Sequence, residues 1–241
     1  MTATALITGG SKGIGAAIAA RLADEGYVLT LAARSQDDLD NTAARLNTEV
    51  HTVVADMKRE EDVRALAASH RERFGRLDVL VISAGVGTAG PIADMPMRTY
   101  ERTLDVNLRA PIVLIQETLP MLRAAAAANP KSGAKIIVLS SITGVAGEAN
   151  LAAYGASKAA LISLCETVSL EESARGVAAT AISPGYVDTD LSAWKQSELD
   201  PSAMLTVDDV AELAMAITHL SANAVVPNIV LSRAGNQLWR A

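Results

Sequence analysis

Tyr154 and Lys158 are the residues of this chain whose types and spacing most directly indicate chemistry. Residues four positions apart on a helix lie on the same face, so the phenol and the ammonium group can point into one pocket. A free tyrosine titrates near ~10, and a neighbouring cation favours its ionised form. Together with the upstream hydroxyl of Ser141, the pair predicts a site that donates or accepts a proton.

An isolated pair with this spacing is common by chance and usually consists of a packed tyrosine beside a surface lysine. A second motif near the start of the chain favours a functional site. Residues 3–8 are predicted to form a strand, 9–13 a turn and 14–24 a helix. Glycines in such a turn let backbone amides approach a phosphate at the helix N-terminus, where the dipole favours anions. The predicted nucleotide-binding residues are Gly9, Ser11, Lys12, Gly13, Ile14 and Gly15.

The elements that must position these motifs alternate along the chain. Short apolar segments predict strands at 3–8, 28–32, 52–54, 77–82, 135–139, 178–182 and 228–231, with helices between them. This alternation predicts an α/β fold, a doubly wound parallel sheet with helices on both faces. The alanine run 124–128 is expected to end a long helix, stopped by Asn129 and Pro130. No linker or repeat divides the sequence, so we expect a single domain over residues 1–241.

The motifs, in this order, resemble those of the short-chain dehydrogenase/reductase family, in its compact single-domain branch. The resemblance extends from Ala3 to about Arg233, nearly the whole chain. It implies a Rossmann fold with seven strands in the order 3-2-1-4-5-6-7 and a nicotinamide coenzyme. Besides the glycine turn, the matching residues are Asp56, Ser83-Ala84-Gly85, Asn107, Ser141, Tyr154, Lys158, Pro184-Gly185 and Thr189.

The resemblance also implies a role for each residue of the reaction centre. Tyr154 would be the general acid/base, and Lys158 would bind the nicotinamide ribose and lower the proton affinity of the tyrosine. Ser141 would hydrogen-bond the substrate oxygen, and Asn107 would hold a water in a proton relay. This chemistry is coherent in itself, because hydride addition to a carbonyl creates an alkoxide that needs a proton donor and a fixed hydrogen bond.

Further residues are implied in coenzyme binding. Asp56 resembles the residue that contacts the adenine amino group, with Met57 beside the ring. Ser83 departs from the asparagine that is usual in the family, whereas the small residues Ala84 and Gly85 are retained and leave room for the coenzyme. The loop that resembles the nicotinamide-positioning loop of the family contains Pro184, Gly185, Val187 and Thr189.

The residues after the second strand bear on the choice of coenzyme. A carboxylate there would accept hydrogen bonds from the adenosine ribose, but none occurs at positions 32–35. The planar guanidinium of Arg34 can instead bind a 2′-phosphate, with Lys12 adding a second positive charge and Ser35 a hydroxyl. In the family both basic positions accompany NADP(H), which is therefore the expected cofactor.

The composition narrows the class of protein. The chain has 241 residues, 50% of them hydrophobic, and a net charge of −6, which argues against nucleic acid or an anionic membrane as the main partner. Cys165 cannot form an internal disulfide, and the three histidines lack metal-ligand spacing, so no metal site is predicted. A turn at residue 9 leaves no room for a signal peptide, and no apolar segment reaches the ~18 residues that span a bilayer. We expect a cytoplasmic protein.

Residues 190–206 are expected to form a short lid over the substrate, with Glu148 and Tyr186 near the pocket mouth. A short lid favours a small or medium carbonyl compound or secondary alcohol. The first interpretation is an NADP(H)-dependent carbonyl reductase or alcohol dehydrogenase. Two alternatives stay open: a 3-oxoacyl-thioester reductase acting on an acyl carrier protein, and a non-catalytic NADP(H)-binding sensor or scaffold. The family also implies a homotetramer or homodimer, in which helices at about 100–127 and 154–173 pair across a two-fold axis.

Overall fold

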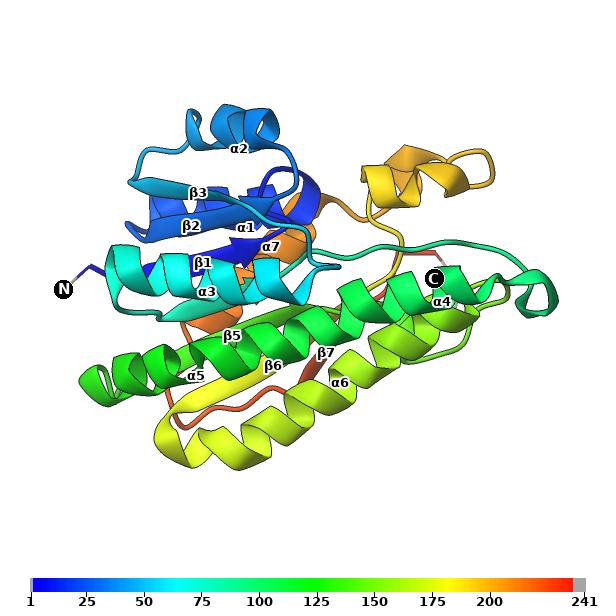
Figure 1. Ribbon diagram of the computed structural model, residues 1–241. Coiled ribbons are helices and arrows are strands. Elements are labelled where there is room, and N and C mark those ends of the chain that lie inside the picture. The colour runs from blue at the N-terminus through cyan, green and yellow to red at the C-terminus, as the bar shows by residue number, and fades with distance from the viewer. Residues whose placement is uncertain (1, 236–241) are drawn as a thin grey trace.

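The computed structural model describes residues 2–235 of the chain. They form one parallel sheet of seven strands in the order β3-β2-β1-β4-β5-β6-β7, which confirms the predicted fold class and strand order (Figure 1). Every predicted strand is present, although β3 begins earlier and β6 is longer at both ends than the sequence indicates. The strands are β1 (Thr4–Thr8), β2 (Val28–Ala33), β3 (Val50–Val54), β4 (Val79–Ile82), β5 (Ala134–Leu139), β6 (Val177–Pro184) and β7 (Asn228–Leu231).

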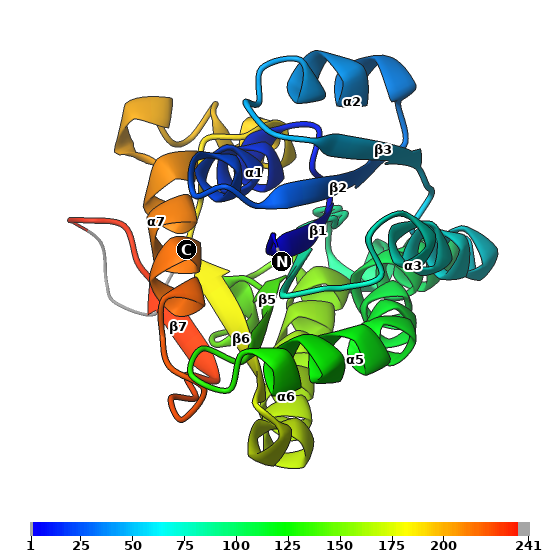
Figure 2. The same ribbon diagram turned by 90° about the vertical axis from the view of Figure 1, so that its left-hand side faces the viewer.

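Helices cover both faces of the sheet. Figure 2 shows α1 and α7 on one side and α3, α5 and α6 on the other. The helices are α1 (Gly13–Asp24), α2 (Gln36–Ala43), α3 (Glu60–Phe74), α4 (Met97–Leu104), α5 (Ala110–Ala128), α6 (Ala152–Glu172) and α7 (Val207–Thr218). Within residues 2–235, no helix has the length and apolar character needed to cross a membrane.

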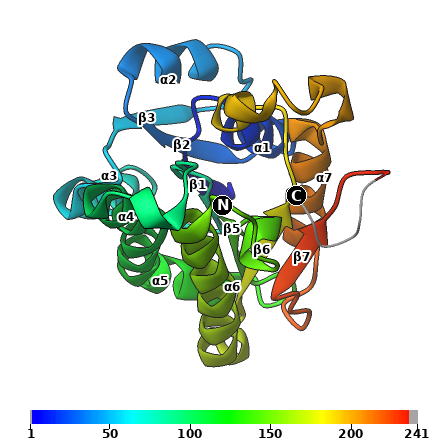
Figure 3. The same ribbon diagram turned by 90° about the vertical axis from the view of Figure 1, so that its right-hand side faces the viewer.

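The apolar core lies in two layers, one on each face of the sheet. Leu66 of α3, Leu114 of α5 and Leu161 of α6 belong to one layer, and Ile18 of α1 and Val210 of α7 belong to the other. All residues of β1, β4, β5 and β6 are buried, as expected for central strands of a parallel sheet covered on both faces. Because the strands are parallel, their carboxyl ends meet at one edge, where polar residues can gather. Figure 3 looks onto that edge.

The predicted helix at 100–127 is interrupted. A π-helical turn, Asp105–Arg109, separates α4 from α5, and Asn107 lies within it. A π-turn forms i→i+5 hydrogen bonds and inserts an extra residue, which the apolar periodicity of the sequence does not reveal. The predicted end of this helix is confirmed, because α5 stops at Ala128 with Asn129 as its C-cap.

Candidate active site

The turn between β1 and α1 is tightly packed. Gly9 has φ +65°, a left-handed conformation that residues with a side chain rarely adopt. A Cβ on Gly15 would lie only 2.3 Å from the carbonyl oxygen of Gly9, so neither position accepts a larger residue without a shift of the backbone. Gly13 begins α1, which directs the N-terminus of that helix toward the pocket lined by Ile14. The turn predicted from the sequence is therefore present at the carboxyl edge of the sheet.

Ser11 and Lys12 have protein partners in this turn. The backbone carbonyl of Ser11 accepts a 2.8 Å hydrogen bond from the hydroxyl of Thr42 in α2. Lys12 Nζ lies 3.2 Å from Asp190 Oδ2, and both side chains are exposed. The lysine that the sequence assigns to a coenzyme phosphate therefore contacts the first residue of the lid.

Arg34 and Ser35 follow β2, as predicted, but their side chains differ in availability. Arg34 is exposed and makes no ion pair among residues 2–235. The hydroxyl of Ser35 accepts a 3.2 Å hydrogen bond from the backbone N–H of Asp38 and caps α2. Capping satisfies one of the free amides at a helix start, so this hydroxyl has a structural partner that the sequence prediction did not include.

Asp56 and Met57 lie just after β3 at the same edge. Asp56 Oδ1 accepts a hydrogen bond of 3.0 Å from the backbone N–H of Lys58, while its own N–H donates to Asp62 Oδ2. Met57 is 9% exposed and belongs to the core layer under α3 and α5. Asp56 therefore remains partly accessible, whereas the Met57 side chain is mainly a packing residue.

Ser83, Ala84 and Gly85 follow β4. The backbone N–H of Ala84 donates a 3.2 Å hydrogen bond to the hydroxyl of Thr8 at the end of β1. This bond connects the carboxyl ends of β1 and β4. A Cβ on Gly85 would lie 3.4 Å from Lys158 Nζ and 3.5 Å from Asn107 Oδ1, which places this glycine directly beside the reaction centre.

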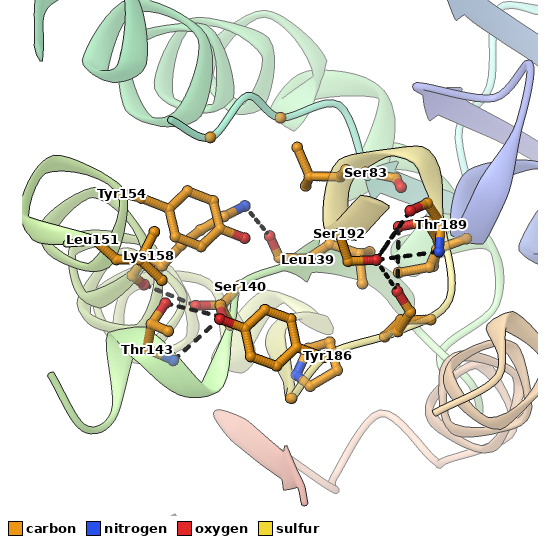
Figure 4. Close-up of a pocket in the computed structure, with 18 of the residues that line it drawn as sticks. Ser83, Leu139, Ser140, Thr143, Leu151, Tyr154, Lys158, Tyr186, Thr189 and Ser192 are labelled. Atoms are coloured by element: carbon orange, nitrogen blue, oxygen red, sulfur yellow. Dashed lines mark hydrogen bonds between the residues drawn. The ribbon is translucent and has the colours of Figure 1, made fainter. Parts of the chain in front are cut away.

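The predicted reaction centre is assembled from β5, the turn after it and the start of α6. Lys158 is buried, and its Nζ donates a 2.7 Å hydrogen bond to the carbonyl of Leu139 (Figure 4). That Nζ lies 5.5 Å from the centre of the Tyr154 ring. The hydroxyl of Ser141 accepts hydrogen bonds from the backbone N–H and the hydroxyl of Thr143. Tyr154, Lys158 and Ser141 all line the same pocket.

The electrostatics of this pair differ from the sequence expectation. Burial raises the pKa of Tyr154 to about 12, and a hydrogen bond with Ser141 opposes part of the rise. Burial also lowers the pKa of Lys158 to about 8. The expected lowering of the tyrosine pKa by its lysine is thus absent in the protein alone, because desolvation disfavours the charged form of each group.

Asn107 is fully buried, and the π-turn directs its side chain toward the loop after β4. Its Oδ1 accepts a 2.9 Å hydrogen bond from the N–H of Val86, and its Nδ2 donates to the Val86 carbonyl at 2.9 Å and to Ser157 Oγ at 3.0 Å. Ser157 in turn donates to the backbone carbonyl of Tyr154. Both amide hydrogens are therefore used within the protein, and only Oδ1 retains acceptor capacity for the predicted water.

The loop after β6 completes the pocket. Pro184, Gly185, Val187 and Thr189 all line it, as predicted. The hydroxyl and backbone N–H of Thr189 join a capping box with Ser192 at the start of the short helix Asp190–Lys195, so this hydroxyl is also engaged within the protein (Figure 4). Val187 pairs with Leu205 in a parallel β-bridge, which joins the two ends of the lid.

The substrate end of the pocket is largely apolar. The cavity volume of the pocket is about 120 Å³, and the cavity opens to solvent. Beyond the residues predicted for coenzyme, catalysis or the pocket mouth, the lining also includes Gly87, Thr88, Leu139, Ser140, Thr143, Leu151, Leu191 and Ser192. Leu151 and Thr143 could have been found from spacing, because Leu151 is three residues before Tyr154 and Thr143 is two after Ser141. Trp194 of the predicted lid and Tyr186 also line the pocket, whereas Glu148, predicted near the pocket mouth, is not a lining residue.

The sequence profile that describes the short chain dehydrogenase family matches residues 3–200. The chain belongs to the short-chain dehydrogenase/reductase family. This short-chain dehydrogenase/reductase is 34% identical over 233 residues to an uncharacterized oxidoreductase of Staphylococcus saprophyticus, with 92% of this chain and 94% of the relative covered. It is 30% identical over 209 residues to human dehydrogenase/reductase SDR family member 4, with 84% and 73% covered. The protein is therefore an oxidoreductase.

Solved structures of related proteins superpose on nearly the whole short-chain dehydrogenase/reductase. An alcohol dehydrogenase from the archaeon Thermococcus sibiricus, complexed with 5-hydroxy-NADP, has a TM-score of 0.86 at 27% identity, covering 98% of each chain. A blue fluorescent protein from a metagenomic library, in complex with NADPH, has a TM-score of 0.80 at 30% identity, covering 95% of each chain.

The residues of this short-chain dehydrogenase/reductase fit a nicotinamide dinucleotide. Gly9 and Gly15 let the backbone of the turn close up at the N-terminus of α1, where an anionic pyrophosphate is favoured. Gly85 leaves free the space that a Cβ would occupy beside Lys158 and Asn107. One pocket thus extends from Ile14, at the N-terminus of α1, to Tyr154 and Lys158 at the reaction centre.

Proposed function

We propose that this protein is an NADP(H)-dependent oxidoreductase that reduces small or medium carbonyl compounds to secondary or primary alcohols, or catalyses the reverse reaction. The observation that carries the proposal is the convergence of Ser141, Tyr154 and Lys158 on a pocket that continues to the glycine turn. The family membership supplies the oxidoreductase class, and the geometry supports a carbonyl or alcohol group as the reacting centre.

The proposed chemistry assigns one task to each residue. A bound nicotinamide supplies or accepts the hydride. Tyr154 donates the proton to the developing alkoxide, and a pKa near 12 keeps its phenol protonated at neutral pH, as carbonyl reduction requires. Ser141 hydrogen-bonds the same substrate oxygen: Thr143 supplies two hydrogens to Ser141 Oγ, and the Ser141 hydrogen, which can bind the Tyr154 oxygen, turns to the substrate oxygen when substrate is bound.

Lys158 and Asn107 support the proton donor in this proposal. The Lys158 ammonium, fixed by the Leu139 carbonyl, lies beside the Tyr154 ring and retains donors for a ribose hydroxyl. As an alkoxide develops, a cation at this position stabilises the negative charge that passes to the phenol oxygen. Asn107 fixes the backbone that surrounds this site through Val86 and Ser157, and its free acceptor position on Oδ1 is the place for a relay water.

The preference for NADP(H) over NAD(H) rests on Arg34. This guanidinium follows β2, is exposed and has no ion-pair partner in the described part of the chain, so it is available to a 2′-phosphate. No carboxylate stands at 32–35 to bind a free ribose hydroxyl. Two structural relatives are complexed with 5-hydroxy-NADP and NADPH, which is consistent with this choice.

A coenzyme-oxidation assay tests the proposal. Wild type is mixed with NADPH and a panel of aldehydes, ketones and 3-oxoacyl thioesters, and coenzyme oxidation is followed by absorbance. We expect turnover of aldehydes or ketones, and its loss in Tyr154→Phe with coenzyme binding retained. Turnover of the thioesters alone would favour the acyl carrier protein reductase, and no turnover with any compound would favour the sensor or scaffold.

We also propose that the protein is a homotetramer and that it is cytoplasmic. On the described surface, Leu170 of α6 is 85% exposed, and Ile112 of α5 is also exposed, so the two long helices carry apolar side chains that a partner subunit can cover. Light scattering at micromolar concentration checks the assembly. A monomer mass would contradict it, and a dimer mass would limit the assembly to one two-fold axis.

A further inference from the structure

Tyr186 and Glu148 form a polar pair at the rim of the pocket. Tyr186 lines the pocket on the loop after β6, and its hydroxyl donates a 2.7 Å hydrogen bond to Glu148 Oε1. Glu148 lies in the segment between β5 and α6, between Ser141 and Tyr154 in the sequence. The bond therefore joins the loop that follows Ser141 to the loop that contains Val187. It also holds the Glu148 carboxylate behind the Tyr186 ring, which itself lines the pocket.

The charge of Glu148 is poorly compensated. Its second oxygen, Oε2, is buried without a hydrogen-bond partner, and Glu148 makes no ion pair among residues 2–235. A carboxylate in such a place is screened less than one in open water, so its field extends into the pocket. Burial of Tyr186 raises the pKa of that phenol, and the hydrogen bond and charge of Glu148 raise it further.

Other charged groups at the rim neutralise one another. Lys195 Nζ lies 5.7 Å from the centre of the Tyr186 ring and 5.5 Å from that of Trp194, and it binds Glu198 Oε2 at 2.6 Å. Lys195 and Glu198 thus form a pair with no net charge. Among the side chains that line the substrate end, those of Leu151, Leu191 and Trp194 carry none. Glu148, by contrast, makes no ion pair in the described part of the chain, and its Oε1 accepts a hydrogen bond from Tyr186, which lines the pocket.

We propose that Glu148, held behind Tyr186, is a specificity-determining residue that selects substrates by charge, favouring uncharged and ammonium-bearing carbonyl compounds over those that carry a carboxylate or phosphate. This inference rests on the proposed reductase function and deepens it by naming the substrate class. The Tyr186 hydroxyl strengthens the selection, because its proton is committed to Glu148 and its oxygen can offer only acceptors to a ligand.

The test compares three benzaldehydes with different para substituents: a carboxylate, its methyl ester, and a trimethylammonium group. In wild type with NADPH, we expect kcat/KM for the ester and the ammonium compound to exceed that for the carboxylate by roughly tenfold or more, since unit charges several ångströms apart interact appreciably at a protein surface. Glu148→Gln keeps an acceptor for Tyr186 and removes the charge. In this variant the ratio of kcat/KM for the ester or ammonium compound to kcat/KM for the carboxylate should fall by about tenfold.

Two variants separate charge from structure. Tyr186→Phe removes the hydrogen bond but leaves the carboxylate, so the discrimination against the carboxylate substrate should persist. Asp188→Asn removes an exposed carboxylate from the same loop that makes no ion pair in the described part of the chain, and it should leave the kcat/KM ratio at its wild-type value. The proposal is overturned if Glu148→Gln changes kcat/KM for all three substrates by one factor, or if Asp188→Asn narrows the ratio as much.

A binding measurement makes the result independent of turnover. Dissociation constants of benzoate and benzamide are measured by calorimetry on the enzyme saturated with NADP⁺. Wild type should favour benzamide, and Glu148→Gln should reduce that preference. If no compound of the wider aldehyde, ketone and thioester panel is reduced but the binding preference narrows in Glu148→Gln, the proposed function is contradicted and the role of Glu148 is supported. An unchanged binding preference in Glu148→Gln would sink the inference whatever the activity.

Discussion

The side-chain amide of Asn107 exchanges two hydrogen bonds of 2.9 Å with the backbone of Val86. A third bond runs from Asn107 to Ser157, whose hydroxyl binds the carbonyl of Tyr154. One buried side chain thereby connects the loop after β4 with the first turn of α6. The π-turn makes this possible, because the extra residue turns the amide inward from a long helix.

Replacement of Asn107 by Ala should destabilise the protein. The change leaves the partly buried N–H and carbonyl of Val86 without their partner, and an unsatisfied group costs up to about 1–3 kcal/mol when it is fully buried. Urea unfolding followed by circular dichroism measures the loss. Asn129→Ala is the matched control, since that exposed residue makes no side-chain hydrogen bond among residues 2–235, and it should have a much smaller effect. Equal destabilisation by both variants would contradict a supporting role for Asn107.

Replacement of Tyr154 by Phe should lower turnover by at least ~10²-fold, the usual contribution of a positioned acid or base. The ring remains, so NADPH binding measured by fluorescence titration should stay within a few-fold of wild type. Tyr100→Phe removes a phenol hydroxyl from exposed α4 and serves as the control. A Tyr154→Phe enzyme that keeps near-native rates would rule out this tyrosine as proton donor.

The coenzyme preference should depend on Arg34. A charge-assisted contact with a 2′-phosphate contributes about 1.5–3 kcal/mol, so Arg34→Ala should weaken NADPH binding by roughly one to two orders of magnitude and barely affect NADH. Ala33→Asp should shift the preference further toward NADH, because a carboxylate repels the phosphate and accepts hydrogen bonds from the free ribose. The measurement is kcat/KM for both coenzymes.

The exposed Arg45→Ala variant controls for a general loss of positive charge and should leave both coenzymes unaffected. If wild type prefers NADH, or if Arg34→Ala weakens both coenzymes equally, Arg34 does not select the 2′-phosphate.

Loss of the Asp190 charge should strengthen NADPH binding slightly. Lys12 lies 3.2 Å from Asp190 Oδ2, so the lysine must leave that carboxylate to reach a phosphate. Exposed ion pairs contribute only about 0.2–1 kcal/mol, and Asp190→Asn should therefore tighten NADPH binding at most about fivefold, with no change for NADH. Asp188→Asn alters a neighbouring exposed carboxylate that makes no ion pair with Lys12 and is the control. Identical shifts for both coenzymes would exclude competition between Asp190 and the phosphate.

The stability of the fold should decrease below about pH 6.5 because of His70. Burial lowers the pKa of this histidine, whose Nδ1 contacts the Thr30 hydroxyl and whose Nε2 contacts the Arg76 carbonyl. In the unfolded chain His70 takes up a proton near pH 6.5, whereas in the folded protein it takes up the proton only at a lower pH. The unfolded state therefore holds more protons in this window, and stability falls as pH falls through it.

Urea unfolding at a series of pH values checks this sign. His70→Gln should flatten the decline between about pH 6.5 and 5, and His219→Gln, at an exposed histidine, should retain most of it. If His70→Gln follows the wild-type curve, other groups set the acid sensitivity.

The alternation of apolar segments and helices predicted a parallel sheet covered on both faces, and the resemblance to the family implied its strand order. The sequence also placed Tyr154 and Lys158 together, since their spacing is fixed by the helix. It did not predict the π-turn at Asn107, which depends on backbone hydrogen bonds, nor the capping roles of Ser35 and Thr189, which depend on neighbouring amides. The pKa of Tyr154 was also missed, because a motif carries no information on how deeply its members are buried.

The bridge between Val187 and Leu205 closes the lid as a loop whose ends already touch. Because the two ends of the segment between Val187 and Leu205 are paired, its length can change without moving the sheet beneath it. The entropic penalty of such a change is small, about 0.6 kcal/mol for each doubling of a flexible loop. If the segment between Val187 and Leu205 covers the substrate, as predicted, replacing it with a segment of another length should change the substrate without altering the reaction centre.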